Sequence, residues 1–259
     1  MDLQLKDKVI PVTGGDKGIG YGICQVLAEE GAIPVIIGRT RENVIEATEQ
    51  IQATGTEAFS VLAELTDPRQ CEAAIQEIIK KYGRIDGLVN NAGVNDGVSL
   101  EHGNHTDFIK SLEKSLVHYY YMAHLALPYL KKSQGAIVNI GSKTSVTGQG
   151  DTSGYAAANG GRNALTREWA VELLPYKIRV NAIIVAECYT PQYKKWIKTF
   201  DNPEAQLKII TDKIPLENRM TTEREIADNA AFLLSPRSSH TTGQLFFIDG
   251  GYVHLDRAL

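Results

Sequence analysis

The chain has 259 residues, of which 43% are hydrophobic and 22% charged, and its formal net charge is -4 at pH 7. This acidic balance argues against nucleic acid as a partner, because nucleic-acid-binding domains concentrate Lys and Arg into a positive surface. No stretch reaches the roughly 20 apolar residues of a membrane helix, so we expect no membrane partner either.

Short apolar runs alternate with longer segments of helical period, which predicts βαβ units and a parallel sheet. Strands are expected at residues 9–13, 33–38, 58–62, 87–91, 136–140, 179–184 and 245–248. Helices are expected near residues 18–31, 41–53, 68–82, 106–131, 153–174 and 223–235, with Asp67 and Thr222 as N-caps. The sequence therefore predicts one α/β domain over residues 1–259, a Rossmann-like doubly wound sheet of about seven parallel strands with helices on both faces.

Two features interrupt this regular pattern. Pro11 falls inside the first strand, where a central parallel strand would use its backbone N–H, so we expect a local irregularity there. Residues 186–220 are rich in Tyr, Lys and Pro and lack a clear strand period. A segment of this length inside a compact domain is usually a lid or binding loop, and we expect it to cover the substrate.

The first strand runs directly into a glycine-rich turn, Thr13-Gly14-Gly15-Asp16-Lys17-Gly18-Ile19-Gly20, after which a helix begins. Glycines allow a tight turn and a close approach to a pyrophosphate, and the helix N-terminus offers N–H groups and a partial positive charge. A glycine trio alone is a weak signal, because other α/β proteins also carry one. We expect a dinucleotide to be bound by Gly14, Asp16, Lys17, Gly18, Ile19 and Gly20.

A second turn of small residues, Asn90-Asn91-Ala92-Gly93, ends the fourth strand, at the sheet edge where open α/β sheets bind ligands. The pattern TGxxxGxG followed by NNAG closely resembles the short-chain dehydrogenase/reductase family, and the likeness extends over essentially the whole chain. The resemblance implies a nicotinamide coenzyme, with Asn91, Ala92 and Gly93 beside it.

The choice between NAD and NADP depends on the residues that meet the 2′ position of the adenosine ribose. The second strand ends in Gly38-Arg39-Thr40 rather than in an acidic residue. Arg39 and Lys17 favour a 2′-phosphate, because a guanidinium suits phosphate well, and NADP is therefore expected rather than NAD. Glu64, followed by Leu65, stands where the family usually has an Asp that contacts adenine.

The resemblance also implies a catalytic Ser thirteen residues before a Tyr, and Ser142 and Tyr155 have that spacing. Tyr155 would accept the proton of an alcohol during oxidation, and Ser142 would hold the substrate oxygen. The other two catalytic positions depart from the family pattern: Asn159 replaces the usual Lys four residues after Tyr155, and Ser115 replaces a usual Asn. An unperturbed tyrosine has a pKa of about 10, and Asn159 can bond a ribose hydroxyl but carries no charge to stabilise a phenolate.

These departures leave two functions open. In the first, the protein is an NAD(P)-dependent oxidoreductase with weakened activity or another proton route. In the second, it is a dinucleotide-binding pseudoenzyme that has lost hydride chemistry. We favour the enzyme, because Ser142 and Tyr155 are both present together with a substrate loop. Asn159→Lys tests the point: a large gain would mean that an ammonium was limiting, and no change that another group does its work.

Several segments resemble the bacterial L-fucose dehydrogenase branch, among them Ser142-Lys143-Thr144 and Thr147-Gly148-Gln149-Gly150. Such enzymes oxidise the anomeric carbon of an aldose to a lactone, so a sugar is the expected small-molecule substrate. A sugar pocket needs polar groups and an aromatic wall for the apolar ring face. The candidates are Asn95, Lys143, Gln149, Glu187, Tyr189, Tyr193 and Trp196. Thr190 resembles the family residue that bonds the nicotinamide carboxamide.

The histidines and cysteines show no metal-ligand spacing, and no metal is predicted. The three cysteines lie far apart and the N-terminus lacks the apolar core of a secretory signal, so a reducing cytoplasm is expected. Relatives are commonly tetramers, and a homotetramer is expected here. Its contacts would come from the helix carrying Tyr119-Tyr120-Tyr121 and from the C-terminal residues 254–259.

Overall fold

Runs of buried aliphatic residues form the strands of the structure, a computed structural model that describes residues 1–255. The strands are β1 (Val9–Thr13), β2 (Ile33–Gly38), β3 (Phe59–Leu62), β4 (Gly87–Asn90), β5 (Ala136–Ser142), β6 (Arg179–Val185) and β7 (Leu245–Ile248). All pair in parallel in the order β3-β2-β1-β4-β5-β6-β7, which confirms the predicted sheet. The order reverses between β1 and β4, where doubly wound sheets bind their ligands.

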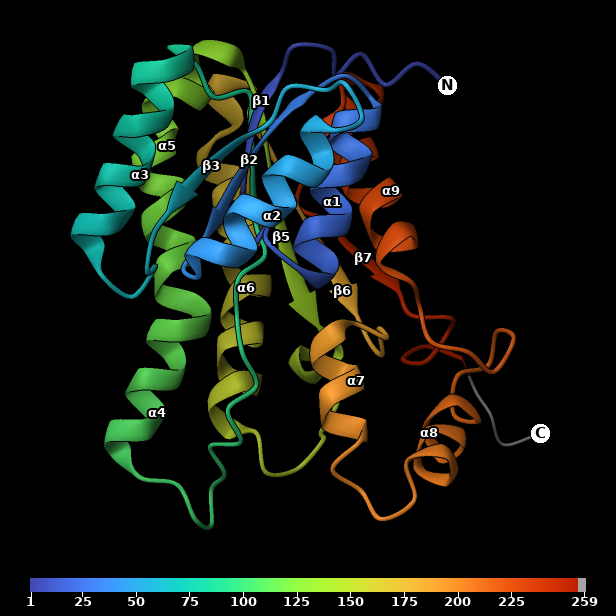
Figure 1. Cartoon of the computed structure of the whole chain (residues 1–259). Coiled ribbons are helices and arrows are strands. Elements are labelled where there is room, and N and C mark those ends of the chain that lie inside the picture. Colours follow the sequence, from blue (N-terminus) through green and yellow to red (C-terminus); the bar gives the residue numbers. More distant parts are fainter. Residues whose placement is uncertain (256–259) are drawn as a thin grey trace.

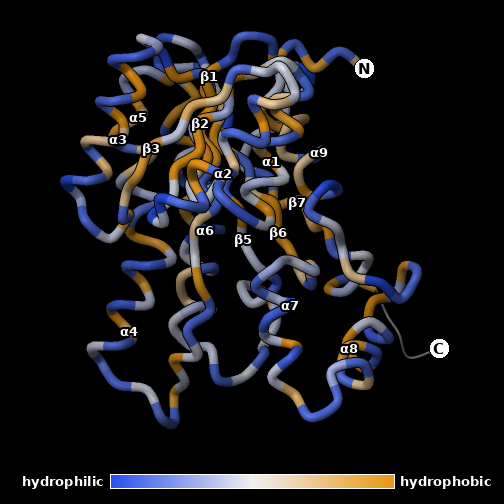
Figure 2. Tube along the Cα trace, viewed as in Figure 1, coloured by the Kyte–Doolittle hydropathy of each residue, from blue (hydrophilic) through white to orange (hydrophobic). Residues whose placement is uncertain are grey.

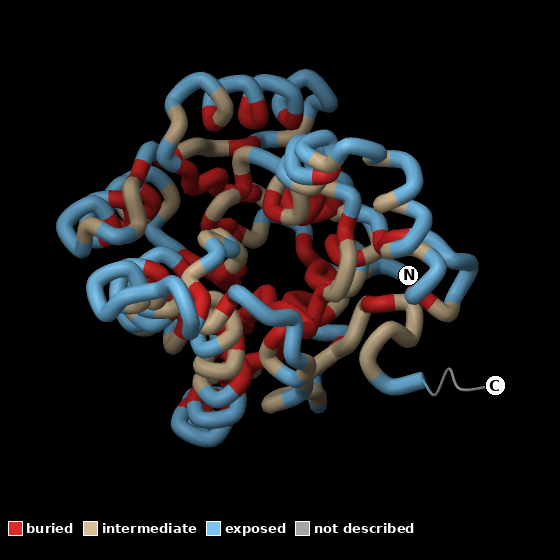
Figure 3. The backbone as a smooth tube through the Cα atoms, turned by 90° about the horizontal axis from the view of Figure 1, so that it is seen from below, coloured by how far each residue is buried: buried red, intermediate tan, exposed pale blue. Residues whose placement is uncertain are grey.

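Helices cover both faces of the sheet (Figure 1). They are α1 (Gly18–Glu29), α2 (Arg41–Gln52), α3 (Pro68–Tyr82), α4 (His105–Leu112), α5 (His118–Ser133), α6 (Ser153–Glu172), α7 (Pro191–Ile197), α8 (Pro203–Thr211) and α9 (Glu223–Leu234). Apolar residues of α1, α2 and α9 form one core cluster and those of α3, α5 and α6 the other. The apolar strands therefore lie between two layers of helices (Figure 2), and the buried residues gather at the centre when the molecule is seen from below (Figure 3).

Both predicted N-caps are confirmed. The Asp67 side chain accepts a hydrogen bond from the backbone N–H of Arg69 (3.0 Å) at the start of α3. Thr222 Oγ1 accepts from the backbone N–H of Glu225 (3.2 Å), and the Glu225 carboxylate accepts from the backbone N–H of Thr222 (2.8 Å). This reciprocal capping box fixes the first turn of α9.

Pro11 shortens the pairing of β1 on one side only. β1 pairs with β2 from Val9↔Ile33 through Thr13↔Ile37, but with β4 at the single position Val12↔Val89. The carbonyl of Val9 faces β4, because it accepts from the backbone N–H of Asp86 (2.8 Å). Pro11, two residues on, faces the same side and has no N–H to donate. The expected irregularity is therefore confirmed as a lost hydrogen bond toward β4.

The single helix predicted over residues 106–131 is wrong in one detail. α4 and α5 are joined by a π-helical turn, Glu113–Val117, which holds the buried Ser115. A π turn changes the hydrogen-bond register without leaving the helical region, so the apolar period of the sequence carries little sign of it. Such turns are frequent at functional sites, and this one places Ser115 beside the sheet.

The segment 186–220 contains two helices, α7 and α8, that lie beyond the carboxyl ends of β5 and β6 (Figure 1). Its two ends meet: the backbone N–H of Thr221 donates to the carbonyl of Glu187 (3.0 Å), and Cys188 bridges Thr221 in parallel. The sequence predicted no helix within this segment, yet Pro191 and Pro203 each begin one. The segment therefore leaves the sheet after β6 and returns to a point beside its own start.

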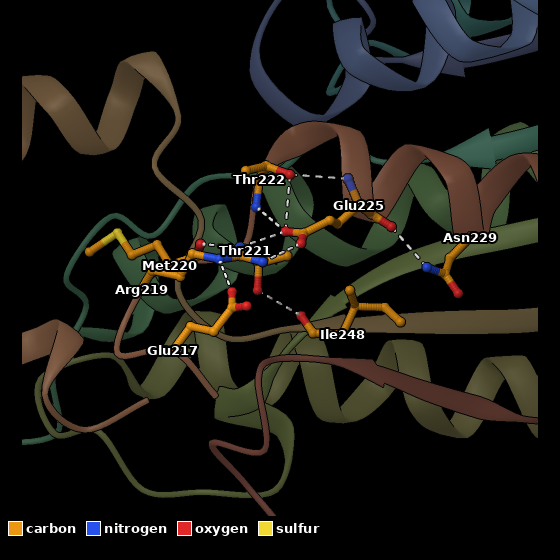
Figure 4. Close-up of polar contacts among 8 residues, drawn as sticks. All are labelled: Glu217, Arg219, Met220, Thr221, Thr222, Glu225, Asn229 and Ile248. Atoms are coloured by element: carbon orange, nitrogen blue, oxygen red, sulfur yellow. Dashed lines mark hydrogen bonds and ion pairs between the residues drawn. The ribbon is translucent and has the colours of Figure 1, made fainter. Parts of the chain in front are cut away.

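The exit of this segment is anchored to α9 and β7 (Figure 4). The Arg219 guanidinium pairs with Glu225 (2.7 Å) and with Glu217 (2.6 Å), and Thr221 Oγ1 donates to the carbonyl of Ile248 (3.3 Å). The hydrogen bonds and charge of Arg219, together with hydrogen bonds from Thr222, lower the pKa of Glu225 to about 2. The Glu225 carboxylate thus takes part both in the capping box of α9 and in the ion pair with Arg219.

Candidate functional site

The glycine turn after β1 is folded too tightly for side chains. Gly14 and Gly18 have φ of +64° and +54°, and a Cβ at Gly20 would lie 2.1 Å from the carbonyl oxygen of Gly14. The turn opens directly into α1, whose first turn has neither a side-chain cap nor an acidic residue. Its N–H groups are therefore available to an anion, and the residues present fit a dinucleotide pyrophosphate.

The two glycine-containing turns are bonded to each other, as their positions at adjacent strand ends require. Thr13 Oγ1 accepts from the backbone N–H groups of Asn91 (2.8 Å) and Ala92 (3.1 Å). The Asn91 amide donates to the carbonyls of Thr13 (2.9 Å) and Gly14 (3.2 Å). The Asn91 side chain therefore serves to clamp the turn, and the backbone of the Asn91 to Gly93 turn borders the coenzyme site.

The predicted adenosine residues lie together at the ends of β2 and β3. Arg39 pairs with Glu64 at 3.4 Å, with 71% of the Arg39 side chain exposed. Burial raises the pKa of Glu64, but hydrogen bonds from Thr66 and the charge and hydrogen bond of Arg39 lower it below its ordinary value overall. Leu65 packs against the α3 and α5 core, and Ile19 against the α1 and α9 core. The Asp16 carboxylate lies beside Gly38, 2.9 Å from a Cβ built there.

Ser142 ends β5 and Tyr155 lies near the start of the following helix, α6. Ser142 is the last residue of that strand, is 8% exposed, and accepts a hydrogen bond from the backbone N–H of Thr144 (3.3 Å). Tyr155 is in the first turn of α6 and is partly buried.

The two positions that depart from the family pattern are internally bonded. Asn159 is fully buried, and its amide donates to the carbonyl of Tyr155 (2.8 Å). Its side-chain oxygen accepts from Arg162 Nη1 (3.0 Å). Ser115 Oγ donates to the carbonyl of Val94 (3.1 Å), which ties the π turn to the loop after β4. Asn159 thus makes its bonds within the protein, and Arg162 is a neighbour that the sequence analysis missed.

A buried ion pair follows Ser142. Lys143 pairs with Glu187, their side chains being only 9% and 14% exposed, and the Lys143 ammonium lies 4.1 Å from the ring centre of Tyr252. Burial and the nearby carboxylate of Glu187, which also accepts a hydrogen bond, raise the pKa of Tyr193. The structure therefore brings the predicted substrate residues Lys143 and Glu187 together, with Tyr193 and Tyr252 around them.

The remaining predicted contacts lie on residues 186–220 and on two loops. Tyr193 and Trp196 stack edge to face with ring centres 5.0 Å apart, and Tyr189 is 6.2 Å from Tyr193. Tyr189 and Trp196 are 37% and 45% exposed. Thr190 meets the glycine turn, its Cβ 3.5 Å from a Cβ built on Gly18. The other two predicted contacts, Asn95 and Gln149, are exposed loop residues.

The sequence is similar to a family model and to proteins of known name. The family model described as Enoyl-(Acyl carrier protein) reductase matches residues 14–253. A 3-oxoacyl-(acyl-carrier-protein) reductase of Thermotoga maritima is 31% identical over 97% of this chain and 100% of its own length. The L-fucose dehydrogenase of Bos taurus is 31% identical over 97% of this chain and 91% of its own length. The chain belongs to the short-chain dehydrogenase/reductase family.

Solved structures of dehydrogenases are similar to this chain over almost its whole length. The crystal structure of Cj0485 dehydrogenase is 49% identical, covers 100% of this chain and 99% of its own, and has a TM-score of 0.95. The ligand-free aldohexose dehydrogenase of Thermoplasma acidophilum is 28% identical, covers 98% and 97%, and has a TM-score of 0.89. This short-chain dehydrogenase/reductase is therefore an oxidoreductase that acts on a CH–OH group of a small molecule, in a family that uses NAD or NADP.

Among residues 1–255, no group of three or more His, Cys, Asp or Glu side chains is placed to hold a metal ion. No helix there is both long and apolar enough to cross a membrane.

Proposed function

We propose that this protein oxidises an aldose of the L-fucose type at its anomeric carbon and that its coenzyme is NADP. In this reaction the hydroxyl proton leaves the substrate, the C–H bond gives up its electron pair, and a cyclic lactone forms. The coenzyme, when bound, accepts the two electrons with the hydrogen. The remaining steps are the work of the chain's own residues.

Tyr155 takes the proton from the anomeric hydroxyl, and Ser142 holds the oxygen while the proton leaves. The two residues suit these roles because Ser142 is the last residue of β5 and Tyr155 lies in the first turn of α6, the helix that follows it. Thr190, placed at the glycine turn, is proposed to orient the carboxamide of the nicotinamide.

The buried Lys143–Glu187 pair is the observation that favours a sugar. An apolar acyl chain or ring system laid against it would leave the remaining hydrogen-bonding capacity of the two charged groups unused, which is costly. Sugar hydroxyls can donate to the carboxylate and accept from the ammonium. The aromatic residues of the lid supply a wall for the apolar face of the ring. Relatives named as an L-fucose dehydrogenase and an aldohexose dehydrogenase support the same substrate class.

NADP is favoured over NAD because Arg39 follows β2 and Lys17 lies in the glycine turn, where each could meet a 2′-phosphate. Glu64 already pairs with Arg39, and we propose that a 2′-phosphate takes the place of that carboxylate. The Asp16 carboxylate beside Gly38 is the feature that favours NAD, since an acidic group there can accept a hydrogen bond from a free 2′-hydroxyl.

We further propose a homotetramer in a reducing compartment such as the cytoplasm. Three free, buried cysteines are consistent with such a compartment. The predicted interface needs one correction, because Tyr119 is fully buried inside its own subunit, where its hydroxyl donates to the carbonyl of Ile140 (2.9 Å). Tyr120, which is 52% exposed, is the contact residue that remains. Of the predicted C-terminal contact, residues 256–259 lie outside the described residues.

The test is turnover of an aldose panel including L-fucose, with NADP and with NAD, from pH 7 to pH 10. We expect lactone and reduced NADP to form in equal amounts, and Tyr155→Phe to abolish turnover while coenzyme binding by calorimetry is kept. Glu187→Gln should raise the KM for the sugar about tenfold or more, because hydrogen bonds to charged groups contribute about 1.5–3 kcal/mol. Glu172→Gln, an exposed change at the end of α6, is the matched control.

Three results would contradict the proposal in different ways. Coenzyme binding without turnover of any substrate at any pH would identify a pseudoenzyme. Turnover of acyl or steroid alcohols but not of aldoses would refute the sugar. Absence of calorimetric heat with either coenzyme would refute the dinucleotide site itself.

A further inference from the structure

The last strand leads into a tight turn, residues 249–255, which we call the C-terminal turn. Gly250 and Gly251 both have positive φ, +62° and +82°. The carboxylate of the buried Asp249 accepts a hydrogen bond from the backbone N–H of Gly251 (2.8 Å). The carbonyl of Asp249 accepts from the backbone N–H of Tyr252 (3.1 Å). The backbone of this turn therefore fixes the position of Tyr252.

The C-terminal turn is bonded both to β7 and to the segment 186–220. The backbone N–H of Leu216 donates to the carbonyl of Gly250 (3.0 Å). A Cβ built on Gly250 would lie 2.7 Å from Cγ2 of the buried Ile214, so this glycine packs directly on that side chain. His254 stacks edge to face on Phe247 of β7, with the ring centres 4.3 Å apart. The turn is thus an ordered part of the domain.

Tyr252 places its ring over the ammonium of Lys143. Lys143 Nζ is 4.1 Å from the ring centre, well inside the distance of about 6 Å at which a ring face attracts a cation. Lys143 also pairs with Glu187, whose carboxylate accepts a further hydrogen bond from Tyr193. Lys143 directly follows Ser142, the residue proposed to hold the substrate oxygen. The C-terminal turn therefore reaches the proposed substrate site.

Burial distinguishes this ring contact from one on the surface. The side chains of Lys143 and Glu187 are 9% and 14% exposed. The ammonium of Lys131 lies 3.8 Å from the ring centre of Tyr176, but Tyr176 is 40% exposed. A cation–π contact is stronger where the cation is desolvated. The ring of Tyr252 therefore lies against a largely desolvated ammonium, where its attraction is strongest.

The two contacts of the Lys143 ammonium determine its direction. An ammonium has three N–H bonds, and the Glu187 carboxylate accepts one of them. The ring of Tyr252 covers another side of the ammonium. Without such contacts the flexible four-carbon stem of a lysine would leave its charge in several places. Because the Lys143–Glu187 pair is the surface proposed to bind the sugar hydroxyls, the ring of Tyr252 determines how that surface is presented.

We propose that Tyr252 is a positioning residue of the substrate site: its ring holds the Lys143 ammonium on Glu187, and the C-terminal turn forms a wall of that site. The inference rests on the proposed function, in which this ion pair binds the sugar. The ring, and not the hydroxyl, carries the role, because a cation is attracted by the π face. Phenylalanine should therefore replace Tyr252, and leucine should not.

The first experiment compares Tyr252→Phe with Tyr252→Leu in the aldose assay. We expect the Leu variant to raise the KM for the sugar about fivefold or more, with kcat and the calorimetric affinity for NADP both within about twofold. The Phe variant should keep the KM. Tyr176→Leu, which removes the exposed ring contact with Lys131, is the matched control. A Leu variant with the wild-type KM, or a Phe variant with the same loss as Leu, overturns the proposal.

A second experiment needs no substrate. Acetic anhydride acetylates accessible amines, and peptide mass spectrometry gives the rate at Lys143 in the full chain. Because the ring covers the ammonium, we expect Lys143 to be acetylated about fivefold or more faster in Tyr252→Leu, and at the wild-type rate in Tyr252→Phe. The exposed Lys80 of α3 is the internal reference. An unchanged rate at Lys143 in the Leu variant overturns the proposal.

A double-mutant comparison separates attraction for the cation from ordinary packing. Lys143→Met combined with Glu187→Gln removes both charges of the pair. We expect Tyr252→Leu to lower the Tm of the wild-type protein, and to lower it clearly less in this background, because the ring then has no ammonium to hold. Equal shifts in the two backgrounds would show packing alone and overturn the proposal, since independent contributions add.

Failure of this inference is distinguishable from failure of the proposed function. Absence of aldose turnover in the wild-type protein would refute the proposed function, and the acetylation rates and Tm shifts would still decide whether the ring of Tyr252 holds Lys143. Aldose turnover together with equal acetylation rates in wild type and Tyr252→Leu would leave the proposed function intact and refute the role of Tyr252.

Discussion

Two buried cations of this protein have different surroundings. Lys143 is paired with Glu187, and its ammonium lies 4.1 Å from the ring centre of Tyr252. The groups that accept hydrogen bonds from Arg162 are neutral: the carbonyls of Ser115 and Ile140 and the side chain of Asn159. Residue type alone does not predict this difference, because it depends on the partner of each cation.

Arg39 gives a direct prediction on coenzyme choice. Removing its guanidinium in Arg39→Ala should weaken NADP binding roughly tenfold or more and leave NAD binding within about twofold, because only NADP carries a 2′-phosphate. Calorimetric titration of both coenzymes measures this, with Arg41→Ala in the first turn of α2 as the control. Equal losses for both coenzymes would show that Arg39 does not contact the phosphate.

At the scale of elements, the site depends on how three helices begin or change register. α1 begins without a side-chain cap, so its N–H groups stay available to an anion. The π turn between α4 and α5 directs the carbonyl of Ser115 toward Arg162. The first turn of α9 is capped by Thr222 and Glu225, and the same carboxylate holds Arg219 at the exit of the lid segment (Figure 4).

The α9 cap predicts a pH-dependent contribution to stability. The pKa of Glu225 is lowered to about 2 in the folded protein, so its contribution is complete above the ordinary pKa of about 4.5 and is lost as pH falls toward 2. We expect Glu225→Gln to reduce the free energy of unfolding at pH 6 and the difference from wild type to shrink steadily between pH 4.5 and 2.5. Because the pair is partly exposed, the effect should be modest.

Urea unfolding at a series of pH values measures this difference. Glu49→Gln, on the exposed side of α2, is the control and should show little change at any pH. A Glu225→Gln difference that stays constant down to pH 2.5 would show that the carboxylate does not act as an ionised partner of Arg219.

At the scale of the whole molecule, every predicted site element lies at the carboxyl edge of one sheet. The glycine turn, the turn after β4, Ser142 and the lid follow β1, β4, β5 and β6, respectively, and α7 and α8 extend beyond that edge (Figure 1). The opposite edge carries the short connections into the strands. The predicted site residues and the short connecting loops therefore lie at opposite ends of the sheet.

Exposed apolar side chains on the π turn, α5 and α6 predict the contacts of the assembly. Val117 and Tyr120 are each 52% exposed, and Val171 at the end of α6 is 68% exposed. We expect light scattering to give about four times the chain mass of 28.4 kDa, and Tyr120→Glu to give smaller species. Ile45→Glu, at a 44% exposed position on α2, should leave the mass unchanged. A wild-type mass of one chain would refute the tetramer.

Local pattern was sufficient to predict much of this protein. Seven strands, the two N-caps and the glycine turn follow from periodicity, caps and motif spacing, because each depends on residues close together in sequence. The same local reasoning found the irregularity at Pro11. The choice of Ser142 and Tyr155, and the missing charge at position 159, came instead from the resemblance to the family. It also predicted that residues 186–220 form a separate segment, since its composition differs from that of its flanks.

Only the tertiary structure showed the surroundings of Arg162. Arg162 reads in sequence as one more polar residue of a helix, and it becomes a buried cation because β5, the π turn and the loop after β4 converge on it. The Lys143–Glu187 pair and the burial of Tyr119 were decided in the same way. Burial and partnership join residues far apart along the chain, so they depend on the packing of elements rather than on any local pattern.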